Sequence, residues 1–184
     1  ALIAKQAHQV YAVEKDKDTA KIIKQEFGHL ENIQVIVDDF LEVNLEEKIK
    51  TAKKPLIVVG NIPYNVSTPI IFKLIEHKNL FKQAILTIQK EVAQRIIAKS
   101  NSKDYGILSI MLQVQAKCEK IFDISANSFI PPPKVTSSVI KIDFANAPNF
   151  KINNVAGFED IVKAAFGKRR KTIKNSLSGS AKLK

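Results

Sequence analysis

Short apolar runs alternate along this chain with amphipathic segments of helical length. Apolar runs that end at polar or turn residues are typical of strands buried in a sheet, and the amphipathic spacing is typical of helices with one buried face. The sequence therefore predicts strands separated by helices. The predicted strands span residues 9–13, 32–37, 55–59, 83–88 and 135–144, and helices are predicted at 16–27, 68–77 and 90–99.

Apolar strands joined by helices predict a doubly wound α/β protein, with a parallel sheet covered by helices on both faces. Ligands of such sheets bind at the carboxyl ends of the strands. Glu14 follows the first predicted strand, Asp39 the second and Asn61 the third. We therefore expect these side chains to gather in one crevice.

The pattern changes after Phe144. Residues 146–154 resemble a linker, and residues 158–177 predict helix with a dense basic run. We expect an α/β domain over residues 1–147, incomplete at its N-terminus, and the incomplete beginning of a helical RNA-binding domain over residues 148–184. The basic residues expected to contact phosphates are Lys168, Arg169, Arg170, Lys171 and Lys174. The alternative is a solvated helix end.

The chain of 184 residues carries 29 lysines and arginines against 18 acids, a net charge of +11. Such an excess favours a polyanionic partner, either nucleic acid or an anionic membrane surface. No apolar run approaches the ~20 residues that cross a bilayer, and we expect no membrane partner. The single cysteine, Cys118, forms no internal disulfide and is expected to be a packed thiol in the cytoplasm. Three scattered histidines predict no metal site.

Acidic residues after strands accept hydrogen bonds from nucleosides in dinucleotide folds. Glu14 is placed to accept from a ribose diol and Asp39 from an adenine amino group, although both also fit solvated loop acids or helix caps. Asp38 is adjacent and is able to exchange roles with Asp39. No glycine precedes Glu14, since Gly28 is the first in the chain, so the sequence holds no glycine-rich phosphate loop before that position.

The segment Asn61-Ile62-Pro63-Tyr64 predicts a stiff loop at a strand end, because proline fixes its own φ and restricts the preceding residue. The Asn61 oxygen and a nearby carbonyl would then accept from an exocyclic amine. Tyr64 offers a ring on which a base stacks, worth roughly 1–3 kcal/mol. The alternative is a plain turn.

Five sequence blocks resemble motifs of the ribosomal RNA adenine-N6 dimethyltransferase family, in the family's order and over nearly the whole chain. They are Gly60–Ile71, Leu86–Ile96, Asn101–Met111, Phe129–Val139 and Phe166–Leu177. The resemblance favours the branch that modifies small-subunit rRNA and implies a Rossmann-like methyltransferase fold. It also implies S-adenosyl-L-methionine as cofactor, with Glu14 on the ribose, Asp39 on the adenine and Asn61 beside them.

For the target base, the resemblance implies that Asn61 and the Ile62 carbonyl hold the adenine N6. Pro63 follows them in the same catalytic segment and precedes Tyr64. Tyr64 would stack on the ring and Phe129 would support it. The family's glycine-rich cofactor loop would lie before Ala1 and most of its C-terminal domain after Lys184. We therefore expect a fragment impaired in cofactor binding.

The implied activity is dimethylation of N6 on adjacent adenines of small-subunit rRNA, on the immature small ribosomal subunit, by a cytoplasmic monomer. One alternative is a non-catalytic RNA-binding or ribosome-assembly module with the same fold. The other is a large-subunit rRNA adenine methyltransferase of the macrolide-resistance type.

Overall fold

The computed structural model describes residues 2–167 and 171–178. The strands are β1 (Val10–Glu14), β2 (Ile33–Val37), β3 (Leu56–Asn61), β4 (Phe81–Gln89), β5 (Lys117–Ile124) and β6 (Ser137–Asp143). The helices are α1 (Leu2–Gln6), α2 (Lys17–Phe27), α3 (Leu45–Lys48), α4 (Ser67–Glu76), α5 (Lys90–Ile97), α6 (Ile107–Gln113), α7 (Val155–Phe166) and α8 (Ile173–Ser178). Short 3-10 turns are η1 (Tyr64–Val66), η2 (Lys78–Leu80) and η3 (Ala126–Ser128). The predicted alternation of strands and helices is confirmed.

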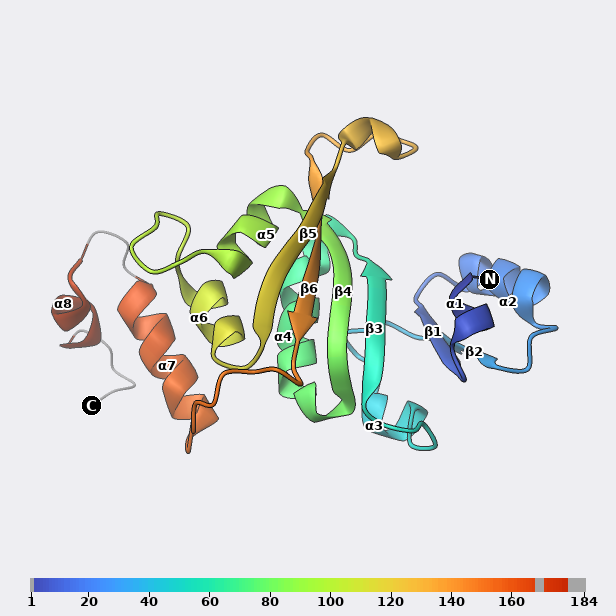
Figure 1. The fold of residues 1–184 in the computed structure, drawn as a ribbon, viewed down its shortest axis with the longest axis horizontal. Helices are drawn as coiled ribbons and strands as arrows, with labels where there is room; N and C mark the ends of the chain where they lie inside the picture. The colour runs from blue at the N-terminus through green and yellow to red at the C-terminus, as the bar shows by residue number, and fades with distance from the viewer. Residues whose placement is uncertain (1, 168–170, 179–184) are drawn as a thin grey trace.

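The strands form two hydrogen-bonded sheets in the described part of the chain (Figure 1). β1 and β2 pair in parallel, and the second sheet has the order β3-β4-β6-β5. The predicted single parallel sheet is wrong at two points. β6 runs antiparallel to β4 and β5, because the segment after β5 turns back directly instead of crossing over through a helix. β1 and β3 belong to different sheets.

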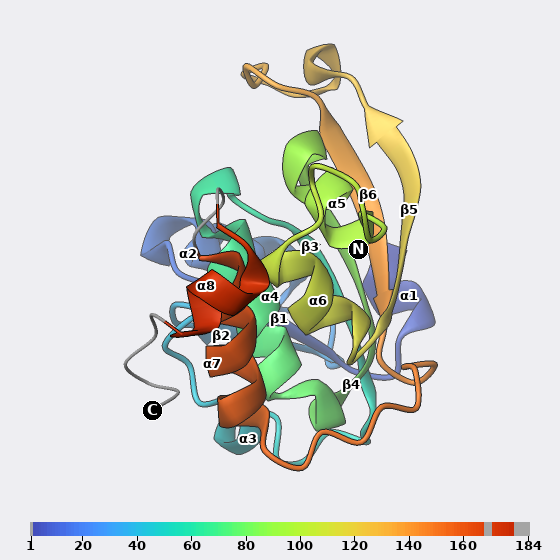
Figure 2. The same ribbon diagram turned by 90° about the vertical axis from the view of Figure 1, so that its left-hand side faces the viewer.

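The core lies between the larger sheet and helices α4, α5 and α6, which Figure 2 shows on one side of β5 and β6. Alternate residues of β4, including Leu86 and Ile88, are fully buried there. Ile71 of α4, Ile96 of α5 and Leu112 of α6 complete the packing, each at 0% exposure. The buried alternate residues of the strands and the buried faces of the helices thus pack together in one core. No described helix has the length and apolar character needed to cross a membrane.

A side-chain cap fixes the start of α2. The Asp16 carboxylate accepts from the Thr19 amide at 2.7 Å. The Cys118 thiol packs as expected, and burial raises its pKa to about 12.

Towards the C-terminus, the Tyr105 ring meets Phe166 of α7 edge to face, with ring centres 6.1 Å apart. The division at residue 147 stays a prediction.

Candidate active site

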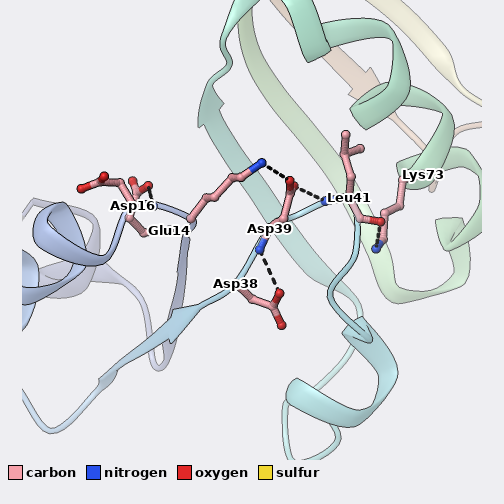
Figure 3. Close-up of polar contacts among 7 residues, drawn as sticks. Glu14, Asp16, Asp38, Asp39, Leu41 and Lys73 are labelled. Atoms are coloured by element: carbon pink, nitrogen blue, oxygen red, sulfur yellow. Dashed lines mark hydrogen bonds and ion pairs between the residues drawn. The ribbon is translucent and has the colours of Figure 1, made fainter.

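Two acidic residues lie at the carboxyl ends of β1 and β2, as the sequence predicts. Glu14 ends β1, and its Oε1 accepts from the Asp16 amide at 2.8 Å. Asp39 follows β2, and its carboxylate accepts from Lys15 Nζ at 2.7 Å and from the Leu41 amide at 2.9 Å. Figure 3 shows Glu14 at the end of β1 beside Asp16, and Asp39 in the loop that follows β2.

The structure distinguishes Asp38 from Asp39. The Asp38 carboxylate accepts from the Asp39 amide at 2.9 Å, and the two side chains point in different directions in Figure 3. The hydrogen bond from Lys15, followed by the Leu41 amide, holds the pKa of Asp39 below its usual value. Asp39 is therefore a charged acceptor facing the β1 end, whereas the Asp38 carboxylate accepts from the backbone amide of the next residue.

The acceptors at these strand ends suit a nucleoside. Ribose hydroxyls and an adenine amino group both donate, and an ionised carboxylate only accepts, with about four lone-pair sites. The bonds from Asp16, Lys15 and Leu41 leave some of those sites open on each carboxylate. Glu14 and Asp39 thus both keep acceptor sites that hydroxyl or amino donors of a ligand can use.

Lys73 of α4 fixes the loop that carries Asp39. Its Nζ donates to the carbonyls of Leu41 at 2.8 Å and Val43 at 2.7 Å, and lies 5.9 Å from the centre of the Phe40 ring. Sequence reasoning missed Lys73, because its partners lie about 30 residues earlier in the chain. The lysine ties the β2 loop to the helix that follows the Asn61 segment.

A pocket of about 290 Å³ opens at the end of β3. It brings together all five residues predicted around the target base, and adds three from the segment before β6. The lining residues are Asn61, Ile62, Pro63, Tyr64, Phe129, Ile130, Pro131 and Pro133. Its volume lies near the lower end of the roughly 300–1,000 Å³ typical of ligand pockets, which suits a small planar group.

The hydrogen-bond acceptors in this pocket differ in whether they already have a donor within the protein. The Pro63 carbonyl accepts from the Val66 amide at 3.1 Å and from Ser67 Oγ at 3.2 Å. None of the hydrogen bonds among the described residues ends on the Ile62 carbonyl. The Ile62 side chain is buried and its amide bonds to β4, which fixes the backbone, while Asn61 is exposed. The Asn61 side chain and the Ile62 carbonyl therefore accept no hydrogen bond from the other described residues, and their role toward a ligand stays a prediction.

A hydrogen bond to β6 holds the Tyr64 side chain in place. Its hydroxyl lies 2.6 Å from Ser137 Oγ in β6, and Ser137 is fully buried. The hydrogen bond fixes the ring at the wall of the pocket. Sequence reasoning missed Ser137, since 73 residues separate it from Tyr64 and no local motif joins them.

The predicted RNA-binding run is described only in part. Lys168, Arg169 and Arg170 lie outside the described residues, while Lys171 and Lys174 are exposed. Their role stays a prediction.

An ion-pair cluster lies at the base of the β5–β6 segment. Asp123 accepts from Lys90 at 2.9 Å, Lys120 at 3.1 Å and Ser138 Oγ at 2.7 Å. The Lys90 bond, followed by those from Ser138 and Lys120, holds the pKa of Asp123 well below its usual value. The cluster joins β5, β6 and the start of α5.

Because this pKa is lowered on folding, the ionised Asp123 stabilises the protein above the unfolded pKa of about 4, and that stability is lost as the pH falls towards the folded pKa. Asp123→Asn is therefore expected to destabilise the protein at pH 7 and to have a shrinking effect below about pH 4. Urea unfolding at pH 7 and at about pH 3 measures the change. Asp104→Asn, at an exposed loop position, is the control; an Asp123→Asn effect that does not depend on pH would contradict the cluster's role.

Two solved structures to which this chain is similar are a dimethyladenosine transferase and an rRNA methyltransferase. A dimethyladenosine transferase from Plasmodium falciparum is 28% identical, with a TM-score of 0.79 over 99% of this chain and 64% of that chain. The 23S rRNA methyltransferase ErmE shares the fold, with a TM-score of 0.71 at 24% identity over 98% of this chain and 70% of that chain. The fold is the Rossmann-like α/β fold of S-adenosylmethionine-dependent methyltransferases, as predicted.

Residues 1–183 match the family described as ribosomal RNA adenine dimethylase. Ribosomal RNA small subunit methyltransferase A of Desulfitobacterium hafniense (strain DSM 10664 / DCB-2) is 38% identical over 182 residues. The alignment covers 99% of this chain and 64% of that relative. The chain belongs to the ribosomal RNA adenine dimethylase family, whose methyl donor is S-adenosylmethionine.

Proposed function

We propose that this protein transfers methyl groups from S-adenosylmethionine to N6 of adjacent adenines in small-subunit rRNA during ribosome maturation, as a cytoplasmic monomer. The observation that carries the proposal is the pocket at the end of β3, where Asn61, the Ile62 carbonyl and two aromatic rings meet. The small-subunit target is supported by the relative from Desulfitobacterium hafniense, which carries that substrate in its name.

Methyl transfer to adenine N6 requires two hydrogen-bond acceptors for the amine beside a surface on which the base stacks. The adenine N6 lone pair is delocalised into the ring, which makes the amine a poor nucleophile. Hydrogen bonds from both N6 hydrogens to Asn61 and to the Ile62 carbonyl favour a pyramidal nitrogen and localise the pair. Tyr64 and Phe129 hold the ring, so the gain comes from position and electrostatics.

On the cofactor side, Glu14 would accept from the ribose hydroxyls and Asp39 from the adenine amino group. Asn61 lies at the end of β3, the next strand along the chain, and lines the pocket. When bound, S-adenosylmethionine supplies an electrophilic methyl group on a sulfonium. The proton of the methylated nitrogen leaves afterwards, when that nitrogen is acidic, so no strong base is needed in the pocket.

For RNA, the basic residues from Lys168 to Lys174 would contact phosphates as part of a helical domain that begins near residue 148. The net charge of +11 supports this side of the proposal.

The test is methyl transfer to immature small ribosomal subunits that lack the modification, with dimethyladenosine counted by mass spectrometry of digested rRNA. The Desulfitobacterium hafniense relative is the positive control. Two methyl groups on each of two adjacent adenines are expected. Modification of large-subunit rRNA instead would identify the macrolide-resistance type. RNA binding without transfer, under conditions in which the relative is active, would favour the non-catalytic module.

A further inference from the structure

The segment between β5 and β6 extends beyond the sheet. Strand pairing ends at Ile124 and Ser137, and the residues between them project past β3 and β4 in both views (Figures 1 and 2). We call residues 125–136 the arm. It contributes Phe129, Ile130 and two prolines to the pocket that Asn61 and Tyr64 line from the other side.

Ile130 is a bulky apolar side chain with no cover, at 101% exposure. Single exposed apolar residues are common on protein surfaces and need no explanation by themselves. This one differs in position, because it stands at the rim of the pocket proposed to take the target adenine. The exposed Pro131 and Pro132 follow it, and prolines restrict the backbone, so the tip is stiff as well as apolar.

The charge of the arm suits a polyanion. Lys134 is its one charged residue in the sequence, and no carboxylate occurs between residues 125 and 136. At the arm's base, the exposed fractions of the Lys90 and Lys120 side chains are 42% and 34%, although both also pair with Asp123. An apolar tip flanked by lysines therefore meets a phosphate backbone without repulsion.

An adenine stacked between its neighbours cannot place N6 in a pocket. Enzymes that modify a base turn it out of the stack, at a cost in unstacking, and apolar side chains that enter the resulting gap offset that cost. Ile130 both lines the pocket and is fully exposed to solvent, so it is available to fill the gap that a base turned out into that pocket would leave.

We propose that Ile130 is a wedge that enters the RNA stack next to the target adenine and keeps that base turned out into the pocket. This inference rests on the proposed function, which supplies the RNA substrate. It adds that the enzyme accepts stacked or paired adenines because of the Ile130 side chain. Ile130 is then a specificity-determining residue: it matters for structured RNA and little for an unstacked strand.

The experiment uses the protein and a short RNA stem with 2-aminopurine at the target position, whose fluorescence rises on unstacking. Wild-type protein is expected to raise the emission severalfold, and Ile130→Ala to lose at least four-fifths of that rise. Ile121→Ala is the matched control, since Ile121 lies on β5 of the same hairpin at 48% exposure, and it should behave as wild type.

Methyl transfer gives the second readout. Ile130→Ala should lower kcat/KM at least tenfold on the adenine-containing stem and less than threefold on an unstacked single strand. Equal losses on both RNAs, or an unchanged fluorescence rise, would overturn the wedge. Ile130-dependent binding to phosphatidylglycerol vesicles without any rise on RNA would overturn it in favour of a membrane contact. If wild-type protein methylates neither RNA, the proposed function fails, and the 2-aminopurine signal still decides whether Ile130 unstacks a base.

Discussion

Asn61→Ala is expected to lower kcat for methyl transfer by about 10²–10³-fold, the range for removing one preorganised hydrogen bond at a reacting group. Asn61 ends β3 at the mouth of the pocket, next to the fixed Ile62 backbone. Its side-chain oxygen is one of the two acceptors that would localise the N6 lone pair. The loss should appear in kcat more than in KM, because stacking on Tyr64 and Phe129 is retained.

Single-turnover assays on immature small subunits measure this effect. Asn65→Ala is the matched control, since Asn65 is exposed in η1 of the same loop and does not line the pocket. The control should keep wild-type kcat. If Asn61→Ala retains more than about a third of the wild-type rate, the acceptor pair proposed here is not what activates the amine.

Lys73→Met is expected to release the loop that carries Asp39. The ammonium group donates two short hydrogen bonds to the Leu41 and Val43 carbonyls, and hydrogen bonds to charged groups contribute about 1.5–3 kcal/mol each. Methionine keeps the apolar stem of the side chain and removes the donors. At the lower end of that range the two bonds together contribute about 3 kcal/mol of local stability, and their loss corresponds to a roughly 160-fold larger population of the open loop.

Native-state hydrogen exchange of the Leu41 and Val43 amides measures that opening directly and needs no bound cofactor. Lys48→Met provides the control, because Lys48 is exposed in the neighbouring α3. Exchange at these amides should be unchanged in the control. Wild-type exchange in Lys73→Met would mean that other contacts, such as the Asp39 bond to the Leu41 amide, hold the loop by themselves.

Local patterns predicted most of the elements but not how the strands assemble. The β4 run was predicted within two residues at its N-terminal end and one at its C-terminal end, because alternation and turn residues are local properties. No element is predicted between the helix at residues 90–99 and the strand at residues 135–144, where the structure has α6 and β5. β5 is exposed along most of its length, so it lacks the clear alternation of a strand with one buried face.

The choice between Asp38 and Asp39 likewise depends on how the strands assemble and not on the local sequence. Both residues follow β2, and although the sequence analysis assigns the adenine contact to Asp39, spacing alone leaves Asp38 able to exchange roles with it. The structure separates them through Lys15, which reaches Asp39 from the end of β1, and through the Asp39 amide, which binds Asp38. Such partners depend on how two strands are placed side by side, which spacing along the chain does not specify.

The strand–helix order, the net charge of +11 and the stiff Asn61–Tyr64 loop follow from the sequence alone, since they depend on composition and on neighbouring residues. Folding adds the contacts that the chain order does not specify: Ile130 and the prolines of the arm share a pocket with that loop, Ser137 holds Tyr64, and Lys73 holds the Asp39 loop. These contacts join segments far apart in the chain. They form only when the antiparallel pairing of β6 and the packing of α4 bring those segments together.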